Sequence, residues 1–153
     1  KLQEGTQGKG VMLAESKKSA KSIIDTLYNM NTSILLQQYI AEANGEDLRV
    51  IVVGNKIVAS MKRTSGLDDF RSNVHRGGNI EPVQLTPKEK FIALNATKHL
   101  GLGIAGVDMI RSNNGPLLIE VNASPGLKGI ETATGINVAK HMVQYVERNA
   151  FRK

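Results

Sequence analysis

The chain has 153 residues, 41% hydrophobic and 22% charged, which is typical of a globular domain with a sizeable core. Cysteine is absent, which excludes disulfides and thiolate chemistry, and no run approaches the roughly 18 apolar residues that cross a bilayer. Twenty basic against fourteen acidic residues give a net charge of +6, so anionic partners are favoured. Because the basic residues are dispersed and no aromatic stacking pattern accompanies them, direct reading of nucleic acid is not expected. Without a signal peptide or membrane segment, we expect a cytoplasmic protein.

A glycine-rich segment lies near the start, with the sequence EGTQGKG over residues 4–10. Glycines let backbone amides approach a phosphate closely, and Lys1 or Lys9 would add positive charge. The segment is neither a Walker loop nor a dinucleotide fingerprint, because a strand rather than a helix is expected after it. It is therefore a hairpin turn or a phosphate clamp. The chain opens without methionine directly before this segment, which suggests that it is part of a longer protein.

The next elements are a helix and three apolar runs. Apolar residues at helical spacing predict an amphipathic helix over residues 16–29, with Ser16 as its N-cap. An apolar run over residues 34–40 is expected to form a strand. Residues 48–53 and 56–61 are two further strands, joined by the turn dipeptide Gly54-Asn55 into a hairpin.

Residues 64–80 are polar and contain glycine, and they are too long for an ordinary connector, which suggests a functional loop. Arg71 and Arg76 offer guanidinium groups that clasp phosphate or carboxylate oxygens, and Asn73 offers a donor. His75 is a possible acid or base. A solvated loop without function is the alternative.

The last third of the chain predicts two helices around a second hairpin. Thr86 and Glu89 form a capping box, and Pro87 suits the first position of a helix that reaches about residue 100. Strands are expected over residues 105–111 and 116–121, and Asn137 caps a final helix. This order of elements predicts an α+β fold with mainly antiparallel sheet, in two lobes with a cleft between them.

Three oxygen-bearing residues stand on the second hairpin. Glu120 and Asn122 are two apart on a strand, so they project from one face, and the hairpin can set Asp108 beside them. Magnesium favours carboxylate and amide oxygens, whereas zinc would need histidine or cysteine ligands that this pattern lacks. The alternative is that the acids are exposed, alternating strand residues. Both acids lie in apolar runs, however, where burying an acid without a partner is costly.

Four segments together resemble the RimK-type ATP-grasp ligases, and the resemblance runs nearly from end to end. They are EGTQGKG (residues 4–10), RSNVHRGG (71–78), AGVDMIR (105–111) and LIEVNASPG (118–126). Ligases of this type add glutamate to the C-terminus of the sixth small-subunit ribosomal protein. The resemblance implies the ATP-grasp fold: residues 1–48 would be part of the small lobe that bears the glycine-rich flap, and residues 49–153 the C-terminal metal-binding lobe. The N-terminal domain of the family would be absent.

The resemblance also implies a site. The nucleotide phosphates would be contacted by Lys1 and by the flap glycines Gly8 and Gly10. Gln38 and Tyr39 would form the hinge at the adenine, and Asp47 would be placed for the ribose hydroxyls. The loop would contribute the further nucleotide contacts Arg71, Ser72 and Asn73. Arg71 would be catalytic by steadying the charge on the transferred phosphoryl group. The ligands of Mg²⁺ or Mn²⁺ would be Asp108, Glu120 and Asn122.

The implied chemistry is an ATP-dependent ligation in which a carboxylate is activated as an acyl phosphate and then opened by the amine of glutamate. The implied partners are ATP, glutamate and an acidic protein C-terminus, with no membrane, and a homo-oligomer is compatible with the pattern. Two other functions stay open. One is an ATP-grasp ligase with another acceptor, such as a coenzyme tail or an amino-acid carrier protein. The other is a nucleotide-binding module without catalysis.

Overall fold

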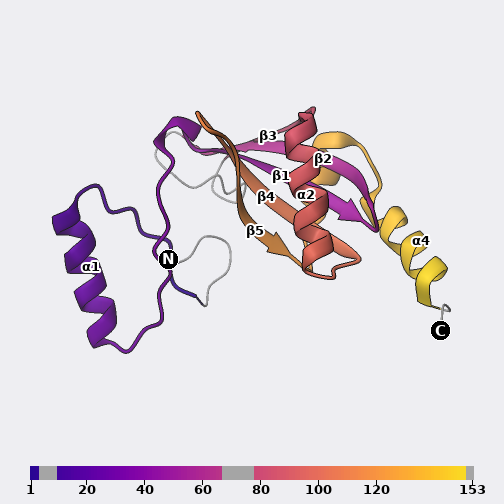
Figure 1. Ribbon diagram of the computed structural model, residues 1–153. Helices are drawn as coiled ribbons and strands as arrows, with labels where there is room; N and C mark the ends of the chain where they lie inside the picture. The colour runs from indigo at the N-terminus through magenta and orange to yellow at the C-terminus, as the bar shows by residue number, and fades with distance from the viewer. Residues whose placement is uncertain (4–9, 67–77, 151–153) are drawn as a thin grey trace. The chain divides into compact units, whose positions relative to one another are not determined.

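The structure is a computed structural model that describes residues 1–3, 10–66 and 78–150. The chain divides into two compact units, Lys1–Ala41 and Glu42–Lys153. Figure 1 labels most of the helices and strands of the two units. None of the helices in the described ranges is long and apolar enough to cross a membrane.

The described residues of the first unit contain one α-helix, α1 (Lys17–Asn29). It begins as predicted at Ser16, whose hydroxyl accepts a hydrogen bond from the backbone N–H of Ser19 at 3.1 Å. The predicted strand over residues 34–40 is wrong for most of its length, because only Ile34 pairs, in an isolated bridge with Leu2. An apolar run does not by itself make a strand, since a strand also needs a partner backbone. A short 3₁₀ helix, η1 (Ala41–Ala43), follows this run.

The second unit is built on an antiparallel five-stranded sheet in the order β3-β2-β1-β4-β5 (Figure 1). Both predicted hairpins are confirmed and are longer than expected. The strands are β1 (Glu46–Val53), β2 (Lys56–Thr64), β3 (Asn79–Pro82), β4 (Ile104–Ser112) and β5 (Gly115–Asn122). β3 was not expected, because it is a four-residue edge strand that begins at the end of the predicted loop over residues 64–80.

Alternation along β1 divides the apolar core into two clusters, one on each face of the sheet. Leu48, Val50 and Val52 pack on one face with Ala93 of α2 (Pro87–His99). On the other face, Ile51 and Val53 pack with a residue from each of the helices α3 (Lys128–Thr134) and α4 (Val138–Ala150). Each such buried side chain contributes about 1.5–3 kcal/mol. The helices therefore cover both faces of the antiparallel sheet, and the predicted α+β class is confirmed.

The predicted capping box of α2 is present and is part of an ion pair. The Glu89 carboxylate accepts from the backbone N–H of Thr86 at 2.8 Å, and the Thr86 hydroxyl accepts from the N–H of Glu89 at 3.3 Å. Glu89 is 2% exposed, and it also accepts from Arg111 of β4 at 2.7 and 3.1 Å. Burial acts to raise the pKa of Glu89, but the hydrogen bonds from Arg111 and Thr86 outweigh it and lower that pKa. This pair fixes α2 against the sheet.

Candidate functional site

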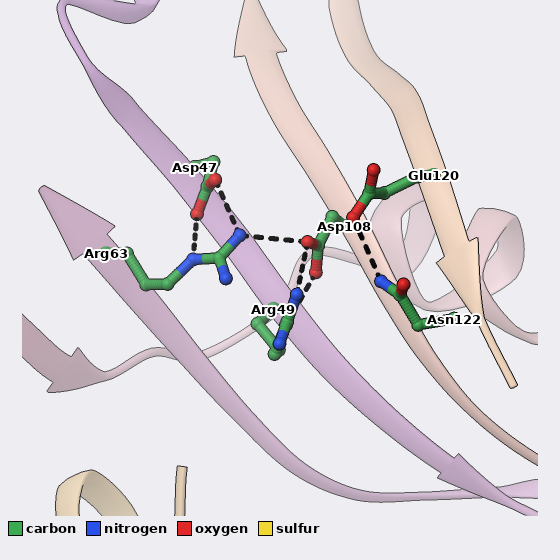
Figure 2. A network of polar contacts seen from close by, with 6 residues as sticks. All are labelled: Asp47, Arg49, Arg63, Asp108, Glu120 and Asn122. Carbon is green, nitrogen blue, oxygen red and sulfur yellow. Dashed lines mark hydrogen bonds and ion pairs between the residues drawn. The ribbon is translucent and has the colours of Figure 1, made fainter. Parts of the chain in front are cut away.

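A row of polar side chains runs across the strands on one face of the sheet of the second unit (Figure 2). Register sets the row: Arg63 of β2 is opposite Asp47 of β1, and Arg49 of β1 is opposite Asp108 of β4. Asp47 and Arg49 are two apart on one strand and so share a face. The row occupies the face that carries Ile51 and Val53 further along β1.

The predicted metal ligands lie at the β4 and β5 end of this row. Asp108 is directly opposite Glu120, and Gly106 is opposite Asn122, so the hairpin brings the three oxygen-bearing residues to one face as expected. The register shifts between Asp108 and Met109, where β5 carries one extra residue. Such a bulge turns the rest of the strand without moving Glu120 away from Asp108.

The three residues offer an oxygen-only donor set. Asn122 donates its amide nitrogen to Glu120 Oε1 at 3.0 Å, a bond that uses neither the amide oxygen nor Glu120 Oε2 (Figure 2). Those oxygens suit a hard divalent cation such as Mg²⁺. Within the described part of the chain, no three histidine, aspartate or glutamate side chains form a group that could hold a metal ion by themselves. The candidate set therefore has two carboxylates and an amide, which fits a metal that keeps waters and substrate phosphates as further ligands.

Asp108 is held by two arginines. Arg49 Nε donates to one oxygen of Asp108 at 2.8 Å and Arg49 Nη2 to the other at 2.5 Å, while Arg63 Nη2 donates to that second oxygen at 2.9 Å. Asp108 is 4% and Arg63 8% exposed. The paired arginines make the burial of this acid tolerable.

Arg63 joins the two acids of the row. It forms a bidentate pair with Asp47 at 2.6 and 2.7 Å, in addition to its bond to Asp108. Burial acts to lower the pKa of Arg63, but the hydrogen bonds and charge of Asp47, together with Asp108, outweigh it and raise that pKa. Asp47, the predicted ribose contact, therefore lies on the same face as the predicted metal ligands.

The remaining predicted nucleotide contacts belong to the first unit or lie outside the described residues. Lys1, Gly10, Gln38 and Tyr39 belong to the first unit, where the backbone N–H of Leu35 donates to the Lys1 carbonyl at 2.7 Å. Gly10 has φ +79, and a Cβ there would lie 2.7 Å from Leu2 Cδ1, so glycine is required at this turn. The predicted contacts Gly8, Arg71, Ser72 and Asn73 lie outside the described residues.

Arg49 and Arg63 are site residues that the sequence reasoning missed. A signal was present, because Arg49 interrupts the apolar run of β1 and a buried charge needs a partner. That partner comes from β4, 59 positions away, and the spacing of residues does not show which strand pairs with β1.

The family of the chain is shown by its sequence. The RimK-like ATP-grasp domain matches residues 1–146. The chain belongs to the RimK-like ATP-grasp family. It is 54% identical over 150 residues to a probable alpha-L-glutamate ligase of Picosynechococcus sp. and 54% identical over 149 residues to probable alpha-L-glutamate ligase 1 of Shewanella frigidimarina. These alignments cover 98% and 97% of the chain, and the chain spans about 50% of the length of each relative.

Solved structures show the same fold at low identity. The RimK-like chain matches the D-alanine–D-alanine ligase of Bacillus anthracis with a TM-score of 0.66 at 21% identity, over 90% of this chain and 49% of that one. It also matches the ATP-grasp ligase PsnB, in a complex with a precursor variant, Mg and ADP, with a TM-score of 0.56 at 20% identity. That match covers 69% of this chain and 32% of PsnB. The predicted ATP-grasp fold is thereby confirmed.

Proposed function

We propose that the protein carrying this RimK-like chain is an ATP-dependent ligase that joins the amine of glutamate to the C-terminal carboxylate of a ribosomal protein. The observation that carries the proposal is the convergence of Asp108, Glu120 and Asn122 on one face of the sheet, beside Asp47. The name of the relatives, probable alpha-L-glutamate ligase, supports glutamate as the amine.

The proposed chemistry has two displacements. An oxygen of the acceptor carboxylate attacks the γ-phosphorus of ATP, so that ADP leaves and an acyl phosphate forms. The amine nitrogen of glutamate then attacks the acyl carbon, phosphate leaves, the nitrogen loses a proton and an amide results. Neither step requires a nucleophile from the protein, which agrees with a chain that has no cysteine.

The roles of the side chains follow from their place in the row. Asp108, Glu120 and Asn122 would hold Mg²⁺ or Mn²⁺, which supplies charge neutralisation for the nucleotide phosphates when bound. Asp47 would face the ribose hydroxyls. Arg71, Ser72 and Asn73 would contact the phosphates, with Arg71 steadying the transferred phosphoryl group.

In this proposal the chain keeps the predicted organisation into two lobes. Residues 1–48 contribute a glycine-rich flap that excludes water from the acyl phosphate, with Lys1, Gly8 and Gly10 near the phosphates and Gln38 and Tyr39 at the adenine. Residues 49–153 carry the metal ligands, although β1 runs across the boundary between the two ranges. The net charge of +6 would favour an acidic acceptor tail in the cytoplasm.

The test is an acceptor screen with the full-length protein, ATP, Mg²⁺ and glutamate. The acceptors are the ribosomal protein, the same protein without its C-terminal residues, a coenzyme with a carboxylate tail and an amino-acid carrier protein. We expect ADP release and a mass increase by glutamate residues on the intact ribosomal protein alone. Modification of another acceptor instead would reassign the substrate. Binding of ATP with no ADP release on any acceptor would favour a module without catalysis.

A further inference from the structure

The arginines around Asp108 are bonded to its carboxylate oxygens, the atoms that would hold a cation. Both carboxylate oxygens accept hydrogen bonds from Arg49, and one of them also accepts from Arg63 (Figure 2). A divalent cation on Asp108 would therefore share its ligand with two positive groups at hydrogen-bond distance. Like charges this close, around a carboxylate that is 4% exposed, repel strongly.

The charges of the row are nearly balanced without a metal. Asp47, Asp108 and Glu120 carry three negative charges, and Arg49 and Arg63 carry two positive ones. Adding a divalent cation turns this small negative surplus into a positive one. The row then becomes attractive to an anion such as a polyphosphate.

Of the two arginines, Arg49 bonds fewer acids among the described residues. Arg63 is anchored by two bonds to Asp47 and is 8% exposed. Arg49 has its side-chain hydrogen bonds, among the described residues, with Asp108 alone, and its side chain is 15% exposed. Movement of Arg49 would break one ion pair and leave Asp108 with its bond from Arg63.

We infer that Arg49 takes the place of the divalent cation on Asp108 while no nucleotide is bound, and that it moves to the nucleotide phosphates when cation and nucleotide bind together. This rests on the proposed function, because it assumes that Asp108 is a metal ligand. The exchange keeps Asp108 compensated in both states. It also makes cation binding depend on the nucleotide, since the nucleotide offers Arg49 its second partner.

The test compares R49Q with wild type in two binding measurements on the full-length protein. The first is Mn²⁺ binding without nucleotide, followed through the electron paramagnetic resonance signal of free Mn²⁺. The second is binding of a fluorescent ADP in saturating Mg²⁺. We expect R49Q to bind Mn²⁺ alone about tenfold more tightly and the nucleotide about tenfold more weakly, each the effect of roughly one charged pair.

The matched control is R111Q. Arg111 is in β4 on the opposite face of the sheet, where it donates to Glu89. R111Q should bind Mn²⁺ and nucleotide as wild type does. If R49Q does not fold, R49K keeps the charge without the planar fork and should shift both affinities in the same directions by a smaller factor.

An exchange of partners by Arg49 predicts that R49Q changes the two affinities in opposite directions, with tighter Mn²⁺ binding and weaker nucleotide binding. Unchanged or weaker Mn²⁺ binding by R49Q would overturn the competition, and unchanged nucleotide binding would overturn the movement to the phosphates. If wild type bound no nucleotide, the proposed function would fall, and with it the second half of the inference. The Mn²⁺ measurement would still decide whether Arg49 competes for Asp108.

Discussion

The two buried acids in the described part of the second unit, Asp108 of β4 and Glu89 of α2, are each compensated by arginine side chains. Asp108 is paired with Arg49 and Arg63, and Glu89 with Arg111. Removing one partner of a buried pair costs more than the pair contributes, because the other charge is left without compensation. The ion pairs on the two faces of the sheet have different roles. Glu89 caps helix α2 on one face, whereas Asp108 is part of the candidate site on the other.

Because of Glu89, the free energy of unfolding of the domain should depend on pH in the acid range. Its pKa is lowered in the folded chain, so its stabilising effect is present above the unfolded value of 4.5 and is lost as the pH falls through the folded pKa. At neutral pH, Glu89→Gln should lower the free energy of unfolding by about 1–3 kcal/mol. Below pH 4.5 the difference in the free energy of unfolding between Glu89→Gln and wild type should become smaller.

Urea unfolding at a series of pH values measures this gap. Glu147→Gln, on the exposed side of α4, is the control and should leave the curve unchanged. A gap that stays constant through the acid range would contradict a role for the ionised Glu89 carboxylate.

At the scale of elements, the end of β5 depends on a glycine in the neighbouring strand. Gly106 pairs with Asn122, and a Cβ at position 106 would lie 2.7 Å from Cβ of Pro125. The segment after β5 thus crosses directly over the backbone of β4. A side chain there would push this segment outward and take Asn122 with it.

Gly106→Ala should therefore destabilise the domain by about 1–3 kcal/mol and weaken magnesium-dependent nucleotide binding. Gly126→Ala is the matched control, since a Cβ at that glycine has nothing within 4 Å. Thermal unfolding and nucleotide titration check both variants. Equal behaviour of the two alanine variants would show that the approach of Pro125 has no role in placing Asn122.

The sequence predicted elements with a strong local signal. The β1–β2 and β4–β5 hairpins have turn dipeptides and β-branched runs, and α1 and α2 have capping boxes. α3 escaped prediction because it has seven residues and no side-chain cap. At the site, alternation placed Glu120 and Asn122 on one face, but the contacts of Arg49 depend on a pairing between distant strands, which no local pattern determines.

At the scale of the whole second unit, one sheet separates the core on the α2 face from the core on the α3 and α4 face. Tyr145 attaches α4 at a place where two glycines allow close approach. Cβ atoms at Gly54 and Gly103 would lie 2.9 and 2.6 Å from its ring and hydroxyl oxygen, and the N–H of Gly54 donates to the Gly103 carbonyl at 2.7 Å.

Tyr145→Ala should loosen α4 and lower the free energy of unfolding by about 1–3 kcal/mol. Because Tyr145 takes no part in the polar row, nucleotide affinity at a temperature well below unfolding should stay the same. Val146→Ala, half exposed on the same helix, is the control and should change neither property. Loss of nucleotide binding by folded Tyr145→Ala would contradict the separation of α4 from the site.

The most direct test of the whole account is magnesium-dependent ATP binding by wild type and Asp108→Asn, a substitution that keeps the shape of the side chain and removes its charge. Isothermal titration of the full-length protein with ATP, with and without Mg²⁺, gives both affinities, and Asp25→Asn on the exposed surface of α1 is the control. Wild type and Asp25→Asn should bind ATP at least about tenfold more tightly when Mg²⁺ is present, and Asp108→Asn should lose that gain. An equal gain in Asp108→Asn would show that this acid is not a ligand of the metal.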